Sequence, residues 1–297
     1  MNSTPLLPAS TSAYRAMDQV TVQLANGLVV GSTIALTALG LTLVFGIMHI
    51  VNLSHGEFYM MGAYFAWAAH AVLKNFWLSV VVATVVTAII GGALLLAFAQ
   101  KLAGAGPLRW ALLTLGFGYV LRELVQLVFG NDFKLVALPI EGTVPYVGGA
   151  YRVTVMALSV GLIISLAVFL AKSRYGVQIR AIASNPEAAV VVGVSRRTVY
   201  ICVALISAGL AGAAGAFMLP ITSAYPSMGL EILIMAFVVV VVGGMGNIQG
   251  ALLASLVAGE LQALLILLVK PSIATVIVLT VFMVVLVVRR EGIRKLW

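Results

Sequence analysis

A short polar segment contains the side chains that are best suited to chemistry in this sequence. Residues 52–57 supply the amide of Asn52, the hydroxyl of Ser54, the imidazole of His55 and the carboxylate of Glu57, and long apolar stretches flank them on both sides. A charged side chain costs about 2.5 to 3.5 kcal/mol at the centre of a membrane helix, so such groups usually have a structural or functional role. These four residues are therefore candidates for a metal site, a proton relay or a translocation path.

Helical geometry argues against a metal site here. His49 and His55 are six residues apart, which places them about 240° apart around a continuous helix, and His55 and Glu57 also diverge. The sequence contains no HExxH motif and no paired cysteines at zinc-site spacing. We therefore expect no bound metal in this chain.

A proton relay is a stronger alternative, because carboxylates and imidazoles within membrane segments often mark proton paths. Glu57 has few companions for that role. The other acidic residues within apolar stretches are Glu123, Glu231 and Glu260, and Glu123 stands next to Arg122. The relay is left open but is not favoured.

The third interpretation is a break between two helices. Asn52 and Ser54 are typical helix-capping residues, and His55 to Glu57 would form the first turn of the next helix, where the helix dipole favours a carboxylate. Broken helices at membrane depth are tolerated where they are buried in protein or line a cavity. This structural interpretation is therefore compatible with a position near a translocation path.

The composition identifies the environment of these residues. Of the 297 residues, 62% are hydrophobic and 9% are charged, against about 25% charged in a soluble domain. Repeated apolar runs close to the length of a membrane span predict an all-α polytopic integral membrane protein and not a β-barrel. The excess of Lys and Arg lies mostly between these runs, which indicates membrane orientation and not a nucleic-acid partner.

We expect a helical bundle of about 8–9 transmembrane segments with at least one broken helix. A polar N-terminal tail (1–19), a membrane domain (20–288) and a basic cytoplasmic tail (289–297) make up the chain. A second weak point follows the seventh stretch, at Gly243, Gly244 and Asn247, and these residues are also candidates for the translocation path. The nine apolar stretches are 20–47, 56–73, 77–100, 108–129, 152–171, 198–219, 231–246, 250–269 and 272–288.

Charge in the connections predicts the orientation. Residues 172–197 and 289–297 are both net basic and are expected on the cytoplasmic side, whereas residues 130–150 are net negative and are expected outside. Small residues at four-residue spacing, such as Gly27 with Gly31 and Ala208 with Gly212, predict close helix packing.

The basic connection at 172–197 contains a second candidate site. Asn185 is a suitable N-cap, Pro186 fits the first helical position, and Glu187 would lie in the first turn. A short cytoplasmic helix of this kind either docks on a soluble partner or is a simple amphipathic connector. Because the sequence has no Gly-Lys-Ser/Thr phosphate loop, any ATP-driven work must come from another chain.

Several motifs resemble the permease subunits of bacterial branched-chain amino acid ABC importers, the LivH-type proteins. The similarity covers most of the chain from about residue 20 to residue 290. It rests on Gly40 to Gly46, Asn52 to Phe58, Arg122 to Gln126 followed by Gly130, Tyr175 to Ala181, and Val242 to Asn247.

The resemblance implies a non-catalytic, multi-pass subunit of the bacterial inner membrane that translocates branched-chain amino acids. Its partners would be a second related permease in a heterodimer, two cytoplasmic ATPase subunits that bind ATP and Mg, and a periplasmic substrate-binding protein. The chain itself would bind no cofactor, and its C-terminus would be cytoplasmic.

The same resemblance assigns a coupling role to residues 180–197. Glu187, Ala188 and Ala189 followed by Gly193 are similar to the EAA-x3-G sequence that contacts the ATPase, although the usual downstream Ile and Leu-Pro are not found. The coupling candidates are Arg180, Asn185, Glu187, Ala188, Ala189, Gly193 and Arg196. Two alternatives stay open: an importer of urea or short-chain amides with the same architecture, and a proton-coupled carrier that works alone.

Overall fold

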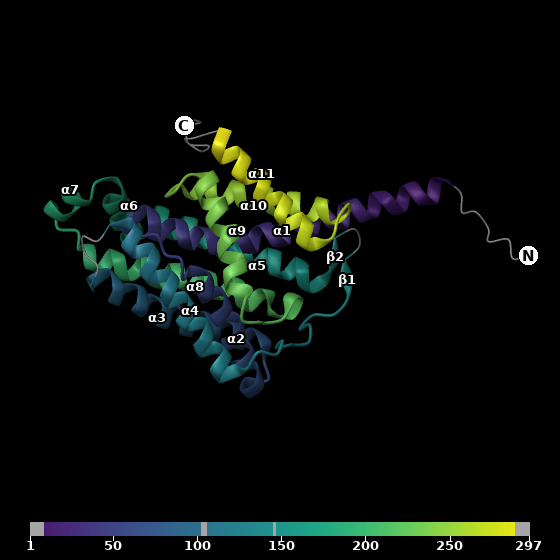
Figure 1. Ribbon diagram of the computed structural model, residues 1–297, viewed down its shortest axis with the longest axis horizontal. Coiled ribbons are helices and arrows are strands. Elements are labelled where there is room, and N and C mark those ends of the chain that lie inside the picture. The colour runs from purple at the N-terminus through teal and green to yellow at the C-terminus, as the bar shows by residue number, and fades with distance from the viewer. Residues whose placement is uncertain (1–8, 102–105, 145–146, 289–297) are drawn as a thin grey trace, which may run out of the picture.

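The computed structural model describes residues 9–101, 106–144 and 147–288, and this part of the chain folds mainly into helices (Figure 1). The helices, in order, are α1 (Ala9–Met48), α2 (His55–Leu73), α3 (Phe76–Lys101), α4 (Pro107–Phe129), α5 (Ala150–Lys172), α6 (Arg174–Ser184), α7 (Pro186–Val191), α8 (Arg196–Thr222), α9 (Met228–Gly243), α10 (Ile248–Ile266) and α11 (Pro271–Val288). A small antiparallel hairpin pairs β1 (Thr143–Val144) with β2 (Gly148–Gly149), with Thr143 opposite Gly149.

The predicted class of a polytopic helical membrane protein is confirmed. Each of the nine apolar stretches coincides with a helix, and within the described residues seven helices are long and apolar enough to cross a membrane. Helix α9 is a shorter apolar helix of 16 residues, and α2 is not among the seven. Helix α2 begins at the polar segment 52–57, and α9 ends at the predicted weak point with Gly243 and Gly244.

Helix α1 extends beyond its membrane-spanning part, which begins at Gln19, close to the predicted residue 20. Helix α1 begins at Ala9, inside the segment 1–19 that was expected to be a tail. After Pro8 the sequence has no proline or glycine before Gly27, so nothing in the backbone chemistry stops the membrane helix from continuing beyond its apolar run. Residues 1–8 and the predicted basic tail 289–297 lie outside the described residues.

Helices α1 and α8 form the centre of the bundle. In their most apolar windows, 83% of α1 and 78% of α8 is buried, against 22% or less of α4, α5 and α11. The apolar outer faces of those three helices are left for lipid or for partner subunits. Figure 1 shows α7 at one end of the molecule, and the hairpin and the start of α1 at the other.

Glycines allow the central helices to touch, as their spacing predicted. Gly27 and Gly31 of α1 pack against Glu260 and Leu256 of α10, and Gly62 of α2 packs directly on the backbone of Gly212 in α8. A methyl group at Gly62 would overlap the carbonyl oxygen of Gly212. In lipid, such close backbone contact replaces the hydrophobic drive that folds soluble proteins.

We predict that Gly62→Ala destabilises the bundle, because the overlap involves backbone that cannot rotate away. Overpacking of this kind costs about 1 to 3 kcal/mol or more. The matched control is Gly161→Ala in α5, where an added Cβ meets nothing within 4 Å. The measurement is the temperature at which the detergent-solubilised protein loses its monodisperse peak in size-exclusion chromatography. Equal melting of the two variants would contradict the packing argument.

Candidate functional site

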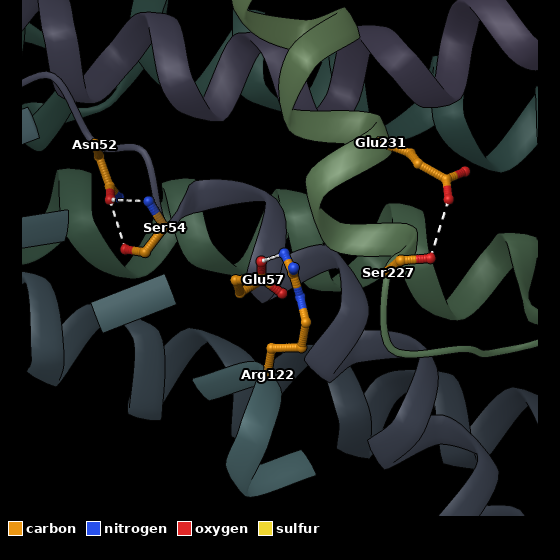
Figure 2. A network of polar contacts seen from close by, with 6 residues as sticks. All are labelled: Asn52, Ser54, Glu57, Arg122, Ser227 and Glu231. Carbon is orange, nitrogen blue, oxygen red and sulfur yellow. Dashed lines mark hydrogen bonds and ion pairs between the residues drawn. The ribbon is translucent and has the colours of Figure 1, made fainter. Parts of the chain in front are cut away.

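The predicted helix break lies where the sequence placed it. Helix α1 ends at Met48, His49 has a left-handed φ of 55°, and α2 begins at His55. The capping detail differs from the expectation: Ser54 is the N-cap residue but its side chain does not cap the helix. Its hydroxyl instead donates to Oδ1 of Asn52 at 2.7 Å, and its backbone N–H donates to the same oxygen at 3.1 Å (Figure 2).

A hydrogen bond from His55 connects the start of α2 to the middle of α1. Its side chain is fully buried, and Nε2 lies 3.1 Å from the carbonyl oxygen of Thr37. Because a carbonyl oxygen only accepts, this contact requires the proton on Nε2. The ring lies against Gly40, which leaves room for it. His55 therefore has a packing role within one subunit.

Glu57 forms an ion pair with Arg122 of α4. Nη2 of Arg122 lies 2.6 Å from Oε1 of Glu57, and the two side chains are only 13% and 3% exposed (Figure 2). The Arg122 guanidinium also lies over the Tyr119 ring, 5.3 Å from its centre. The sequence suggested Glu123 as the neighbour of Arg122, but the partner is a carboxylate 65 residues away. A buried carboxylate held by an arginine is poorly suited to pass protons, which further weakens the relay.

Two contacts of the segment 52–57 with α4 were not predicted from the sequence. Arg122 was noted as a neighbour of Glu123 and as part of a family motif, but not as a partner of Glu57, and Thr114 was not considered. The hydroxyl of Thr114 accepts from the backbone N–H of Leu53 at 3.0 Å, so it satisfies a donor that the break leaves free. The only available signal was that Arg122 and Glu57 are opposite charges in otherwise apolar segments, which favours their pairing.

The starts of α2 and α9 meet beside this ion pair. Gly56 packs on the backbone of Gly229, and the second carboxylate oxygen of Glu57 faces Gly229 as well. Glu231, two residues further along α9, points to a different side of the helix (Figure 2). There, Tyr225 and Ser227 donate hydrogen bonds to its two carboxylate oxygens, at 2.8 and 3.1 Å. Burial, followed by the nearby Glu231 carboxylate, raises the pKa of the Tyr225 hydroxyl, so that it stays protonated and donates.

The second predicted weak point is the turn between α9 and α10. Helix α9 ends at Gly243, Gly244 has a φ of 95°, and Asn247 caps α10 by accepting from the N–H of Gly250 at 3.0 Å. Gly46 at the end of α1 packs on Gly246 of this turn. A cavity of about 610 Å³ opens here and is lined by the end of α1, the α9–α10 turn and Ala183 of α6.

The coupling candidates lie together at one end of the molecule, around α6 and α7 (Figure 1). The predicted helix start is confirmed: Asn185 Oδ1 accepts from the N–H of Ala188 at 3.0 Å, Pro186 is the first helical residue, and Glu187 lies in the first turn. Of the candidate residues, Ala189 is buried and the others are exposed, namely Arg180, Asn185, Glu187, Ala188, Gly193 and Arg196.

Two valines at the end of α7 extend this exposed surface. Val191 is 86% exposed and Val192 is 78% exposed. Neither valine was predicted as a coupling residue, although both are apolar residues within the basic connection 172–197. Exposed apolar groups that form a continuous patch with charged neighbours are typical of a protein interface.

The structure thus separates the candidates into two regions. Asn52, Ser54, His55 and Glu57 lie inside the bundle, and the coupling residues lie at its end. The turn with Gly244 and Asn247 lines the 610 Å³ cavity together with Ala183 of α6. Within the described part of the chain, no group of three His, Cys, Asp or Glu side chains has the arrangement of a metal site.

Comparison with known proteins extends this description. Residues 23–287 match the family model described as "Branched-chain amino acid transport system / permease component". The permease protein BraD of the Pseudomonas aeruginosa high-affinity branched-chain amino acid transport system is 30% identical over 261 residues, covering 81% of this chain and 84% of BraD. LivH of Escherichia coli strain K12, from the system of the same name, is 28% identical over 291 residues, covering 91% of this chain and 94% of LivH.

A third relative has a similar degree of identity. The probable branched-chain amino acid transport permease protein LivH of Methanocaldococcus jannaschii is 28% identical over 255 residues, covering 82% of this chain and 80% of that protein. No solved structure matches the chain.

Proposed function

Because this chain belongs to the branched-chain amino acid transport permease family, we propose that it is the membrane-spanning subunit of an ATP-binding cassette importer. Its cargo is a branched-chain or similar aliphatic amino acid. The family match over residues 23–287, which includes nearly all of the described helices, carries this proposal. The chain is a multi-pass inner membrane protein. It is a non-catalytic transport subunit, and ATP hydrolysis takes place in the partner chains.

The partners follow from this role. A second related permease completes the channel as a heterodimer, two cytoplasmic ATPase subunits bind ATP and Mg, and a periplasmic binding protein delivers the cargo. The chain binds no cofactor of its own. The basic α6–α7 segment and the C-terminus face the cytoplasm, in agreement with the excess of positive charge there.

The exposed end of α7 supports an ATPase contact. Glu187 and Val191 of α7, Val192 just after it, and Arg196 at the start of α8 are all exposed. A surface of this kind offers apolar anchors with a charged rim, which is the usual anatomy of a protein interface. We assign it to the ATPase because no phosphate-binding loop occurs in this chain.

The packing of α6 offers a route for movement into the bundle. Gly176 of α6 lies against the carbonyl oxygens at the end of α5, and Ile179 and Ile182 are buried. Ala183 then borders the cavity that also contacts α1 and the α9–α10 turn. Closure of the ATPase dimer would therefore move α7 and α6 and tilt the ends of α1, α5 and α9 between two packed arrangements.

Uptake by the reconstituted importer tests the proposal. Proteoliposomes that contain both permeases and the ATPases, supplied with the binding protein, are expected to accumulate labelled leucine only with ATP inside. Accumulation of labelled urea in place of leucine would favour the amide importer. Uptake that needs a proton gradient but no ATPase, and that Glu57→Gln abolishes, would overturn the assignment in favour of a proton-coupled carrier.

A further inference from the structure

We propose that Glu231 binds the ammonium group of the amino acid on its way through the membrane. This inference rests on the proposed function and goes beyond it by naming the recognition group in this chain. The family match does not assign a role to Glu231. This carboxylate has an unusual position on α9.

Glu231 is the only charged residue of α9, which is otherwise strongly apolar. Its side chain is exposed and lies in the first turn of the helix, although Gly229 and Leu233 on the opposite side are buried against α2. An ionised carboxylate that faced lipid would be expensive, and charged residues within membrane segments usually face a water-filled path or a partner. We therefore place the Glu231 end of α9 at a water-filled entrance or a partner surface and not against lipid.

The carboxylate is held in one orientation. Tyr225 and Ser227 each occupy one oxygen, at 2.8 and 3.1 Å, and both donors lie in or beside the connection from α8 to α9. Each carboxylate oxygen has a second acceptor direction, so both can still take a hydrogen bond from an ammonium group. The preorganised carboxylate would bind such a group without first paying the entropy of ordering a flexible Glu side chain.

The rest of this side of α9 suits an aliphatic cargo. Ile234 is 44% exposed and Met245 is 52% exposed, and Phe237 and Val241 between them are half-buried. Glu231, Ile234, Phe237 and Val241 follow the three- to four-residue spacing of one face of α9, and Met245 continues it in the turn after the helix ends at Gly243. This face, which we call the α9 stripe (Glu231, Ile234, Phe237, Val241 and Met245), leads from the carboxylate to the 610 Å³ cavity, which Met245 also lines.

A second polar group lies along the α9 stripe. Asn52 is 1% exposed and its amide nitrogen has no partner. Asn52 lines a small cavity with Phe237, Val241 and Met245. A buried amide N–H without an acceptor is costly. Because this cavity holds only about 10 Å³, the amide could donate to the carboxylate of the cargo only after α1 and α9 move apart. The stripe therefore combines an acceptor for the ammonium group, an apolar surface, and a donor.

This arrangement also separates the two candidate cargo classes. A zwitterionic aliphatic amino acid has a cation for Glu231 and an apolar side chain for the stripe. Urea and short amides have no cation and little apolar surface, so an ionised carboxylate offers them no comparable advantage. The chemistry of α9 favours the amino acid.

The first test replaces Glu231 with glutamine in the complete importer. Glutamine keeps the size of the side chain and can accept one of the two hydrogen bonds, but it has no negative charge. Leucine uptake is expected to fall about tenfold or more, with the binding-protein-stimulated ATPase rate retained. The matched control is Glu123→Gln, an exposed carboxylate on α4, which is expected to leave uptake unchanged. Wild-type uptake by the Glu231→Gln importer would overturn the inference.

A labelling experiment tests the same site without transport. Cys202 is the only cysteine, so Glu231→Cys in a Cys202→Ala background provides a single thiol. In the assembled importer we expect this thiol to react with the membrane-impermeant reagent trimethylammonium-ethyl methanethiosulfonate. Lack of reaction, with reaction only to a lipid-soluble maleimide, would show that residue 231 faces lipid and would overturn the inference.

The two levels of the proposal fail in different ways. If the wild-type importer takes up no leucine with ATP, the proposed function is wrong, whatever residue 231 does. If the wild type takes up leucine and Glu231→Gln does so equally well, the function stands and the ammonium site is wrong. Should the glutamine variant not assemble, the cysteine labelling decides.

Discussion

Replacement of Glu57 with leucine is expected to prevent stable folding of the permease, and replacement of Arg122 with leucine is expected to have the same effect. Each single change leaves a charge buried without its partner, which costs about 3 to 5 kcal/mol. That loss is a large fraction of the stability of a typical protein. The side chain of Arg122 is 13% exposed and that of Glu57 is 3% exposed, so water cannot replace the missing partner.

The double variant separates the ion pair from the space it fills. Replacing a buried ion pair with apolar residues of similar volume is often neutral or stabilising. Glu57→Leu with Arg122→Leu is therefore expected to recover most of the stability that either single variant loses. The control is Glu123→Leu, which removes an exposed carboxylate from the neighbouring position on α4.

Two measurements check this prediction: the melting temperature in detergent, and the yield of permease that co-purifies with its partner subunit. A double variant no more stable than the singles would mean that Glu57 and Arg122 act separately. A single Glu57 variant that assembles normally but prefers a different cargo would show that the segment 52–57 determines substrate choice and not folding.

Loss of coupling is the second large effect that we expect. The double variant Glu187→Ala with Arg196→Ala should reduce ATP-driven leucine uptake close to background, although ATP hydrolysis and assembly persist. Both side chains are exposed and no other element covers them, so their removal should change the stability of the permease by only about 0.5 kcal/mol. The effect on uptake would therefore come from the contact with the ATPase.

The matched control for coupling is Lys172→Ala with Arg174→Ala. These residues are also exposed and charged and lie at the same end of the molecule, at the junction of α5 and α6. Uptake and ATP hydrolysis are measured in the same proteoliposomes, so that their ratio reports coupling directly. Unchanged uptake in the Glu187 and Arg196 variant would remove the coupling assignment from α7.

Local features of this chain were predictable because local chemistry determines them. The apolar runs match helices, Asn185 and Pro186 start α7 as their types require, and the backbone breaks near residue 52 and residue 244 where polar residues or glycines interrupt the apolar pattern. Close packing at Gly27, Gly31 and Gly212 also followed from spacing, because only small residues let helices approach so closely. Helix α1 begins before the predicted membrane span, because apolarity marks the span and not the end of a helix.

Contacts between distant parts of the chain depended on the tertiary structure. Arg122 stands beside Glu123 in sequence, but helix α4 directs its side chain to Glu57 of α2. His55 was a possible ligand or proton carrier until the packing of α2 on α1 placed its ring against the carbonyl of Thr37. Sequence spacing cannot choose between such partners, because it does not determine which helices become neighbours.

The segment 52–57 shows most clearly which features the sequence determines and which depend on the tertiary structure. The sequence by itself determined that a membrane protein of this family breaks a helix here, since polar side chains between two apolar runs have no other stable arrangement in lipid. Only the tertiary structure decided what each polar group does: Glu57 pairs with Arg122, His55 bonds to α1, and the Asn52 amide nitrogen is left without a partner beside α9. The physical reason is that the cost of burying a polar group is a property of the residue, whereas the partner that offsets this cost comes from whichever helix packs against it.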